Sequence, residues 1–142
     1  MTTSSFPIES QTIEYKESWR DEYLKWICGF ANAQGGTLYL GINDQQQVVG
    51  IAHSKQLMEQ IPNMITMTMG IMADIDLHYE EEKEYISIHV AQQSMPIAYK
   101  GKYYYRTGST LQELTGIALQ DFMMKKMNLA WDAQIVEEAT LD

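Results

Sequence analysis

The sequence predicts one α/β (α+β) domain, in which a single mixed, largely antiparallel sheet is covered by about three packed helices. Its length of 142 residues is that of one ordinary domain. Apolar residues recur with period two in several short segments, which indicates strands, and at spacings of three and four in longer ones, which indicates helices. The resulting order, β-α-ββ-α-ββ-ββ-α, places strands next to each other too often for a doubly wound parallel sheet.

The chain opens with a predicted strand and a predicted helix. Residues 8–15 alternate roughly between apolar and polar, which indicates a short strand that ends near Lys16. A helical apolar stripe starts after Ser18, whose hydroxyl can cap the first turn. Gly35 and Gly36 end this helix, because glycine adopts the left-handed conformation without a Cβ clash.

The middle of the chain predicts a hairpin and a second helix. Residues 37–42 indicate a buried strand, and the turn at 43–47 leads into a partner strand at 48–51. The second helix is expected over residues 54–68, with a kink or a restart at Pro62.

The second half predicts two further hairpins and a last helix. Residues 74–80 and 84–91 alternate with period two and are joined by a charged corner. Residues 95–100 and 103–108 indicate the next hairpin. The final helix is expected to begin after Thr115.

The composition is that of a globular domain over residues 1–127, followed by a linker over 128–142. The chain is 45% hydrophobic and 20% charged, which excludes intrinsic disorder. The single cysteine, Cys28, excludes an internal disulfide and a thiolate cluster. No segment is long and apolar enough to span a bilayer, and the N-terminus lacks the features of a secretory signal. We therefore expect a cytoplasmic protein without a membrane partner.

The charge of the chain is unevenly distributed. A net charge of −9 argues against a protein that wraps polyanions. Residues 85–127, however, contain five basic and two acidic residues, a local surplus of three positive charges. Nucleic-acid binding therefore stays open for this part of the chain.

The positive charge is concentrated in the segment YKGKYYYRTGS, residues 99–109. It combines Lys100, Lys102 and Arg106 with four tyrosines. Strand alternation puts Lys102, Tyr104 and Arg106 on one face, where the cations would contact phosphates and the tyrosine would stack on a base. The alternative is a solvated sheet face whose tyrosines pack into the core.

Three acids are candidate ligands of a metal ion. Glu9 and Glu14 lie on the first strand and its lead-in, and Asp44 lies in the turn after the second strand. An offset of five puts Glu9 and Glu14 on opposite faces of an ideal strand, so a bulge or turn would have to bring them together. Such a cluster could hold a divalent cation that activates water against a phosphodiester. The alternative is that the three acids are edge-strand and turn residues.

The segment FANAQGG, residues 30–36, has two interpretations. Gly35 and Gly36 end the helix, or their amides form an anion nest together with Asn32. Neither GxxxxGK[ST] nor GxGxxG occurs, so the sequence gives no support for ATP binding.

Taken in order, three segments resemble the Schlafen-type, Alba-like DNA-binding domain: ESQTIEYKES, ICGFANAQGGTLYLGINDQQQVVGI and MPIAYKGKYYYRTGST. The resemblance covers about residues 8–127. Within this family, the chain is similar to the branch of bacterial transcriptional regulators, whose members have also been described as divergent AAA-type ATPases. This resemblance implies a DNA-binding N-terminal domain. The tail LAWDAQIVEEATLD resembles the segment that leads into a C-terminal region in bacterial members of the family.

The resemblance also implies site residues. The ES-x-x-x-E-[YF]-K and G-[IV]-x-D motifs place the three carboxylates of RNA-cutting animal Schlafens at Glu9, Glu14 and Asp44, with Mg²⁺ or Mn²⁺ as the implied ion. The matched motifs add Lys16 and Ser109 to the expected nucleic-acid-binding residues. Those enzymes pair two such lobes into a basic horseshoe, and this chain departs from them with one lobe and a net charge of −9.

Three functions are therefore considered, in order of preference. The first is a nucleic-acid-binding module, with DNA preferred over RNA, that forms the N-terminal part of a bacterial transcriptional regulator and continues into the remainder of a longer chain. The second is a protein-interaction or dimerisation lobe, which would form a homodimer. The third is a metal-dependent endoribonuclease of the Schlafen type.

Overall fold

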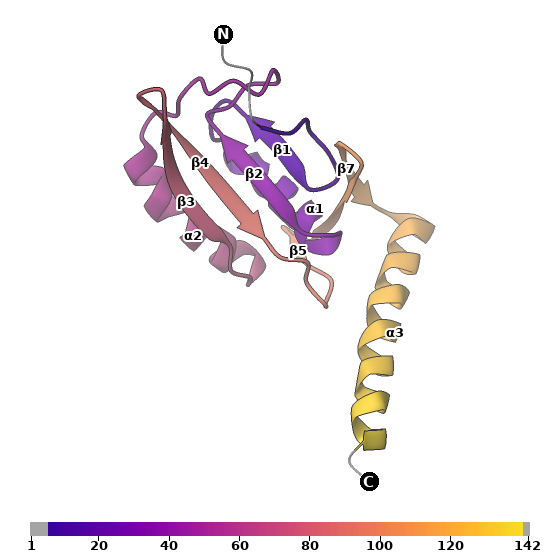
Figure 1. Ribbon diagram of the computed structural model, residues 1–142. Coiled ribbons are helices and arrows are strands. Elements are labelled where there is room, and N and C mark those ends of the chain that lie inside the picture. Colours follow the sequence, from indigo (N-terminus) through magenta and orange to yellow (C-terminus); the bar gives the residue numbers. More distant parts are fainter. Residues whose placement is uncertain (1–5, 141–142) are drawn as a thin grey trace.

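The computed structural model describes residues 6–140, with side chains as far as residue 128. Over this range it confirms the predicted class, a single α+β domain (Figure 1). Two of the three predicted helices pack on the sheets, and most of the last helix extends away from them. The elements are β1 (Ile13–Lys16), the 3₁₀ turn η1 (Asp21–Tyr23), α1 (Leu24–Asn32), β2 (Gly36–Leu40), α2 (Ser54–Met69), β3 (Asp74–Glu80), β4 (Lys83–Val90), β5 (Ala98–Tyr99), β6 (Lys102–Thr107), β7 (Thr110–Leu114) and α3 (Gly116–Thr140).

The described strands form two sheets where the sequence predicts one. In the first sheet the spatial order is β1-β2-β4-β3, with β1 and β2 parallel and the other pairs antiparallel. In the second, β5, β6 and β7 are antiparallel neighbours. The single-sheet prediction is wrong because α1 is buried around most of its circumference and needs cover on two sides. The first sheet covers α1 through β2, and the second covers it through β6.

The predicted hairpin over residues 37–51 does not form. β2 has β1 on one side and β4 on the other, so both of its hydrogen-bonding edges are occupied. Residues 48–51 therefore stay outside the named strands, and Val48 makes one isolated bridge with Ile42.

The predicted strand over residues 8–15 is confirmed in its second half, as β1. The residues before it fold into a turn, which is closed by a bridge between Ser10 and Ile13. This turn matters for the site, because it folds the segment that carries Glu9 back toward β1.

Most of the other elements follow the sequence pattern, but the first helix begins later than predicted. Residues 18–20 are not helical, η1 precedes α1, and Ser18 caps neither of them. The β3–β4 and β5–β6 hairpins are confirmed, and β7 is an addition to the predicted order. α2 continues through Pro62 as one helix, so the restart that the sequence allowed at this proline does not occur. α3 begins at Gly116, as predicted, and extends to Thr140, so it includes most of the segment 128–142. The role of that segment as a linker stays a prediction.

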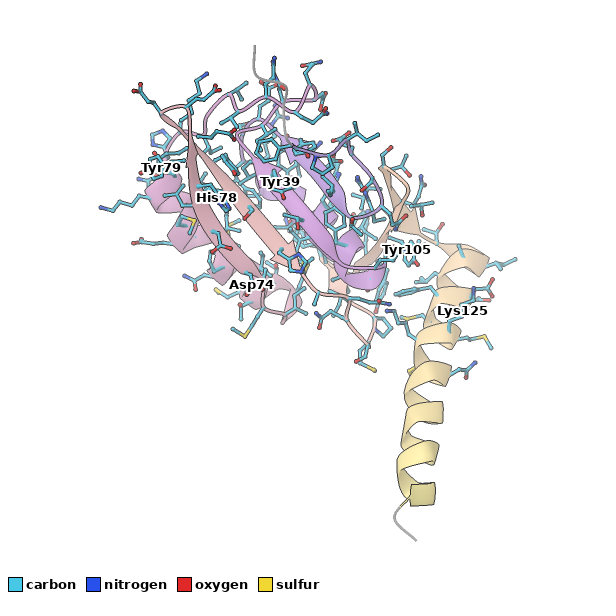
Figure 2. The ribbon with its side chains drawn as sticks, in the orientation of Figure 1. Tyr39, Asp74, His78, Tyr79, Tyr105 and Lys125 are labelled. Carbon is cyan, nitrogen blue, oxygen red and sulfur yellow. The ribbon has the colours of Figure 1, made fainter. Side chains whose placement is uncertain are left out.

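The hydrophobic core lies between the first sheet and the helices α1 and α2. Leu38, Leu40, Ile86 and Ile88 point from β2 and β4 toward these helices and are fully buried. Tyr39 lies on the opposite face, which no helix covers in the described part of the chain (Figure 2). No helix within residues 6–140 is long and apolar enough to cross a membrane.

Gly36→Ala is expected to destabilise the fold. A Cβ at this position would lie 2.5 Å from Cδ1 of Phe30 and 2.8 Å from the carbonyl oxygen of Thr12. Phe30 is fully buried and has little room to retreat, so we expect a loss of about 1–3 kcal/mol in urea denaturation. Gln34→Ala, at an exposed neighbouring position, is the control and should stay within about 0.5 kcal/mol of wild type. Equal stability of the two variants would contradict this.

Candidate functional site

Glu14 is held in a buried ion pair with Arg106. Glu14 on β1 is 5% exposed, and Arg106 on β6 is 0% exposed. Nη1 of Arg106 donates to Oε1 of Glu14 at 3.0 Å, and the Trp26 indole donates to the same oxygen at 2.8 Å. The Tyr15 amide donates to the other carboxylate oxygen at 3.2 Å. Donors of the fold therefore occupy both oxygens of Glu14.

The remaining donors of Arg106 bind main-chain oxygens. Nε and Nη2 donate to the carbonyl of Ser10 at 3.1 and 2.8 Å, and Nη2 also donates to the carbonyl of Ile13 at 2.8 Å. The guanidinium carbon lies 5.2 Å from the Phe30 ring centroid, within cation–π range. Arg106 is therefore not available to a phosphate, because β6 turns this face toward β1 and α1 and away from solvent.

The turn before β1 brings Glu9 close to Glu14. Oε2 of Glu9 accepts a hydrogen bond from the Tyr15 amide at 3.2 Å, and Glu14 contacts the same amide. Asp44 is exposed in the turn that follows β2. Within the described residues, no three His, Cys, Asp or Glu side chains are placed so that they could hold a metal ion. These acids do not fit Mg²⁺ or Mn²⁺, because Arg106 and Trp26 already neutralise and bind Glu14.

The FANAQGG segment connects layers of the fold. Asn32 Nδ2 donates to the carbonyls of Ile97 and Tyr104, both at 2.8 Å, and its Oδ1 accepts from the Ile97 amide at 2.7 Å. Gly35, with φ of +78°, donates its amide to a carbonyl of α1 at 2.7 Å. Gly36 is buried at the start of β2. The predicted nest is therefore not open to an anion, since its groups are used in ending α1 and holding β5 and β6.

The β5–β6 hairpin exposes its lysines and buries two of its tyrosines. Lys100 and Lys102 are exposed, whereas Tyr99 is 4% and Tyr104 7% exposed. Lys100 Nζ lies 5.4 Å from the Tyr99 ring centroid, and Lys102 Nζ lies 3.6 Å from Oε1 of Glu113 on β7. Burial raises the pKa of Tyr104, with smaller contributions from nearby acidic groups. Its ring is not accessible for the predicted stacking on a base.

Two further predicted binding residues lie away from this hairpin tip. Lys16 is half-buried, and its ammonium lies 4.4 Å from the Trp26 ring centroid and 5.0 Å from that of Tyr23. Ser109 is exposed in the turn between β6 and β7.

A pocket of about 340 Å³ lies between the start of α1 and the hairpin. Its lining residues are Asp21, Glu22, Lys25, Tyr99, Lys100, Lys102 and Tyr104. Lys25 comes from α1, and its ammonium lies 5.8 Å from the Tyr104 ring centroid. No sequence signal could place Lys25 beside the hairpin, because the contact is made by the packing of α1 on β6.

The two acids of this pocket have partners that are not among its lining residues. Trp19 Nε1 donates to Oδ1 of Asp21 at 3.0 Å, and Nη1 of Arg20 lies 3.7 Å from Oε1 of Glu22. The pocket lining thus contributes three ammonium groups and two carboxylates, and Lys102, like the two acids, has an ion-pair or hydrogen-bond partner outside the lining, in its case Glu113. The lining residues alone carry one more positive than negative charge, on a chain that is negative overall.

The Glu14–Arg106 pair should contribute strongly to stability. Arg106→Met leaves the Glu14 carboxylate buried without its cation, and we expect a loss of about 3–5 kcal/mol in urea denaturation. The double variant Glu14→Gln, Arg106→Met should recover part of this loss, because it removes both charges. Additive losses in the double variant would show that the two side chains do not depend on each other.

The stability of the protein should fall in alkaline solution partly through Cys28. Burial raises the pKa of this thiol to about 11 from an ordinary value of 9.0. The folded state therefore favours the neutral thiol, a contribution that is complete below pH 9 and is lost as pH rises toward 11. Cys28→Ser, which does not ionise in this range, should reduce the loss of unfolding free energy between pH 9 and 11 by up to about 2–3 kcal/mol. Parallel pH profiles for the two proteins would contradict this.

Comparisons with known proteins agree with this fold. The family model described as Schlafen, AlbA_2 matches residues 9–115. Among solved structures, the DIP2311 protein from Corynebacterium diphtheriae is similar with a TM-score of 0.60 at 18% identity. That match covers 73% of this chain but spans 25% of the other. No curated protein matches the chain.

A second structure is similar over most of its own length. It is the N-terminal domain of a RecG-related protein from Nitrosomonas europaea, whose name refers to an ATP-dependent DNA helicase. Its TM-score is 0.53 at 22% identity, over 76% of this chain and 86% of that domain. At these identities the two structures show the fold alone. The family model, however, covers most of the chain, including Glu14, the FANAQGG segment and the β5–β6 hairpin, so this chain belongs to the Schlafen AlbA_2 family.

Proposed function

We propose that this domain binds nucleic acid, and that the phosphate backbone enters the pocket between α1 and the β5–β6 hairpin. The observation that carries the proposal is the position of three ammonium groups at one pocket, Lys25 from α1 with Lys100 and Lys102 from the hairpin. Lysine ammonium groups are compact charges that bind phosphate oxygens and release counterions from the strand.

The pocket favours contacts with the backbone over contacts with bases. The rings of Tyr99 and Tyr104 are almost fully buried, so neither offers a free face to a base. Phosphate contacts position a strand without reading its sequence. Binding through this pocket is therefore expected to depend little on sequence and strongly on salt.

The charge of the chain predicts weak binding by this domain alone. Asp21 and Glu22 stand at the same pocket, and the net charge of −9 repels a polyanion at long range. Membership of the Schlafen AlbA_2 family and the likeness to an N-terminal domain support a role as one part of a longer protein. In that protein, we propose, the domain adds affinity for nucleic acid to a transcriptional regulator whose other parts supply specificity.

Replacing the three pocket lysines by glutamine tests this function. In the variant Lys25→Gln, Lys100→Gln, Lys102→Gln, affinity for labelled DNA and RNA should fall, and the slope of log K against log salt should shrink by up to about three. Gel shifts at low salt, with and without Mn²⁺, measure binding and also report any cleavage.

A matched variant separates the pocket from general charge. Lys55→Gln, Lys83→Gln, Lys125→Gln removes three exposed lysines that do not line the pocket, so its net charge is the same. We expect it to keep most of the affinity and nearly all of the salt slope. Equal losses in the two variants would remove the pocket from the interface, and the absence of any binding by wild type would refute the proposed function.

A further inference from the structure

The outer edge of β3 is open. β3 lies at the end of the first sheet and pairs with β4, and within residues 6–140 no other strand pairs with it (Figure 1). An edge strand presents main-chain N–H and C=O groups that can receive one more strand. The opposite edge of this sheet is less accessible, because Arg106 binds the carbonyl of Ile13 on β1.

The side chains of β3 differ sharply between its two faces. Ile75 and Leu77 point toward α2, pack on the core and stay partly exposed, and Tyr79 follows them with 72% of its surface exposed. The other face is the open face of the sheet, and at every second position it carries Asp74, Asp76, His78 and Glu80. Figure 2 shows Asp74 and His78 on this face.

Aromatic rings border these carboxylates. His78 stacks on Tyr85 of β4, with ring centroids 4.7 Å apart and an interplanar angle of 16°. Tyr39 of β2 lies next to Tyr85, at 6.4 Å between centroids. Ring faces and carboxylates both attract cations. Lys83, opposite Glu80, is the cation that the strand pairing places on this face at the hairpin end.

We propose that the edge of β3 binds an extended segment of another polypeptide in which lysine or arginine alternates with apolar residues. Such a segment would continue the sheet through main-chain hydrogen bonds. Its basic side chains would lie beside Asp74 and Asp76, because cross-strand neighbours on one face are in contact. Its apolar side chains would fall on the other face and extend the cover over Ile75 and Leu77.

The charge of this edge selects against other occupants. A second copy of the chain would bring its own Asp74, Asp76 and Glu80 to the same face, and like charges on paired strands destabilise the pairing. Nucleic acid is also repelled, because its phosphates carry the same negative charge as these side chains. Acidic residues on an edge normally prevent strand addition, but against a cationic strand they are attractive, so the same residues favour one class of partner.

Two synthetic peptides of equal composition test the pattern. The first, acetyl-Lys-Val-Lys-Thr-Lys-Val-Lys-amide, alternates, and the second, acetyl-Lys-Lys-Val-Thr-Val-Lys-Lys-amide, does not. Fluorescence anisotropy should give an affinity about five- to tenfold higher for the alternating peptide. In an added strand, the amides of every second residue point toward β3. We therefore N-methylate one set of alternate residues in one version of the alternating peptide and the other set in a second version. Only the version whose methylated amides face β3 should lose this advantage. Equal binding of the two peptides would mean that affinity depends on the charge of the peptide and not on its alternation, and it would overturn the proposal.

Paired variants of the protein locate the site. Asp74→Asn, Asp76→Asn should weaken the alternating peptide about five- to tenfold, whereas Glu17→Gln, Glu59→Gln, which changes the net charge equally at exposed positions off β3, should leave it nearly unchanged. The pocket variant Lys25→Gln, Lys100→Gln, Lys102→Gln should also keep peptide binding, so this result is independent of nucleic-acid binding. Equal losses in the two acid variants, or self-association of the protein through β3, would refute the proposal.

Discussion

The buried pair of Glu14 and Arg106 is the interaction on which the arrangement of the two sheets depends. It joins β1 of the first sheet to β6 of the second, and Arg106 also binds the carbonyls of the turn before β1. Burying two charges is costly, and the cost is offset only where the remaining donors and acceptors are satisfied. Here Trp26, the Tyr15 amide and the carbonyls of Ser10 and Ile13 provide those partners.

This pair also determines which cations are left for a ligand. With Arg106 in the interior, the positive charge of the hairpin is reduced to Lys100 and Lys102, and α1 supplies the third ammonium through Lys25. Asn32, at the end of α1, also fixes the packing of α1 on the hairpin, because it binds the main chain of both Ile97 and Tyr104. The pocket is therefore a product of how α1 packs on β6, and its shape depends on residues that do not line it.

Sequence reasoning succeeded where the pairing is local. The β3–β4 hairpin follows from period-two alternation and a short turn, so its strands could be predicted from neighbouring residues. The hairpin over residues 37–51 could not be judged in that way, because the parallel pairing of β1 occupies the edge of β2. Alternation likewise placed Lys102 and Arg106 correctly on one face of β6. It could not show that α1 and β1 cover this face at Arg106 and leave it exposed only at Lys102.

The same limit applies to the three acids, where motif spacing and site geometry give different results. The order of Glu9, Glu14 and Asp44 in the chain resembles that of a catalytic triad of carboxylates, and the turn before β1 does bring Glu9 and Glu14 to one amide. Yet a carboxylate that already binds a guanidinium and an indole is not a free ligand, and releasing it would leave Arg106 buried without its anion. The motif at Glu14 is therefore sufficiently explained by the fold. In this chain the lysines that line the pocket and the exposed acids of β3 are better candidates for contact with partners.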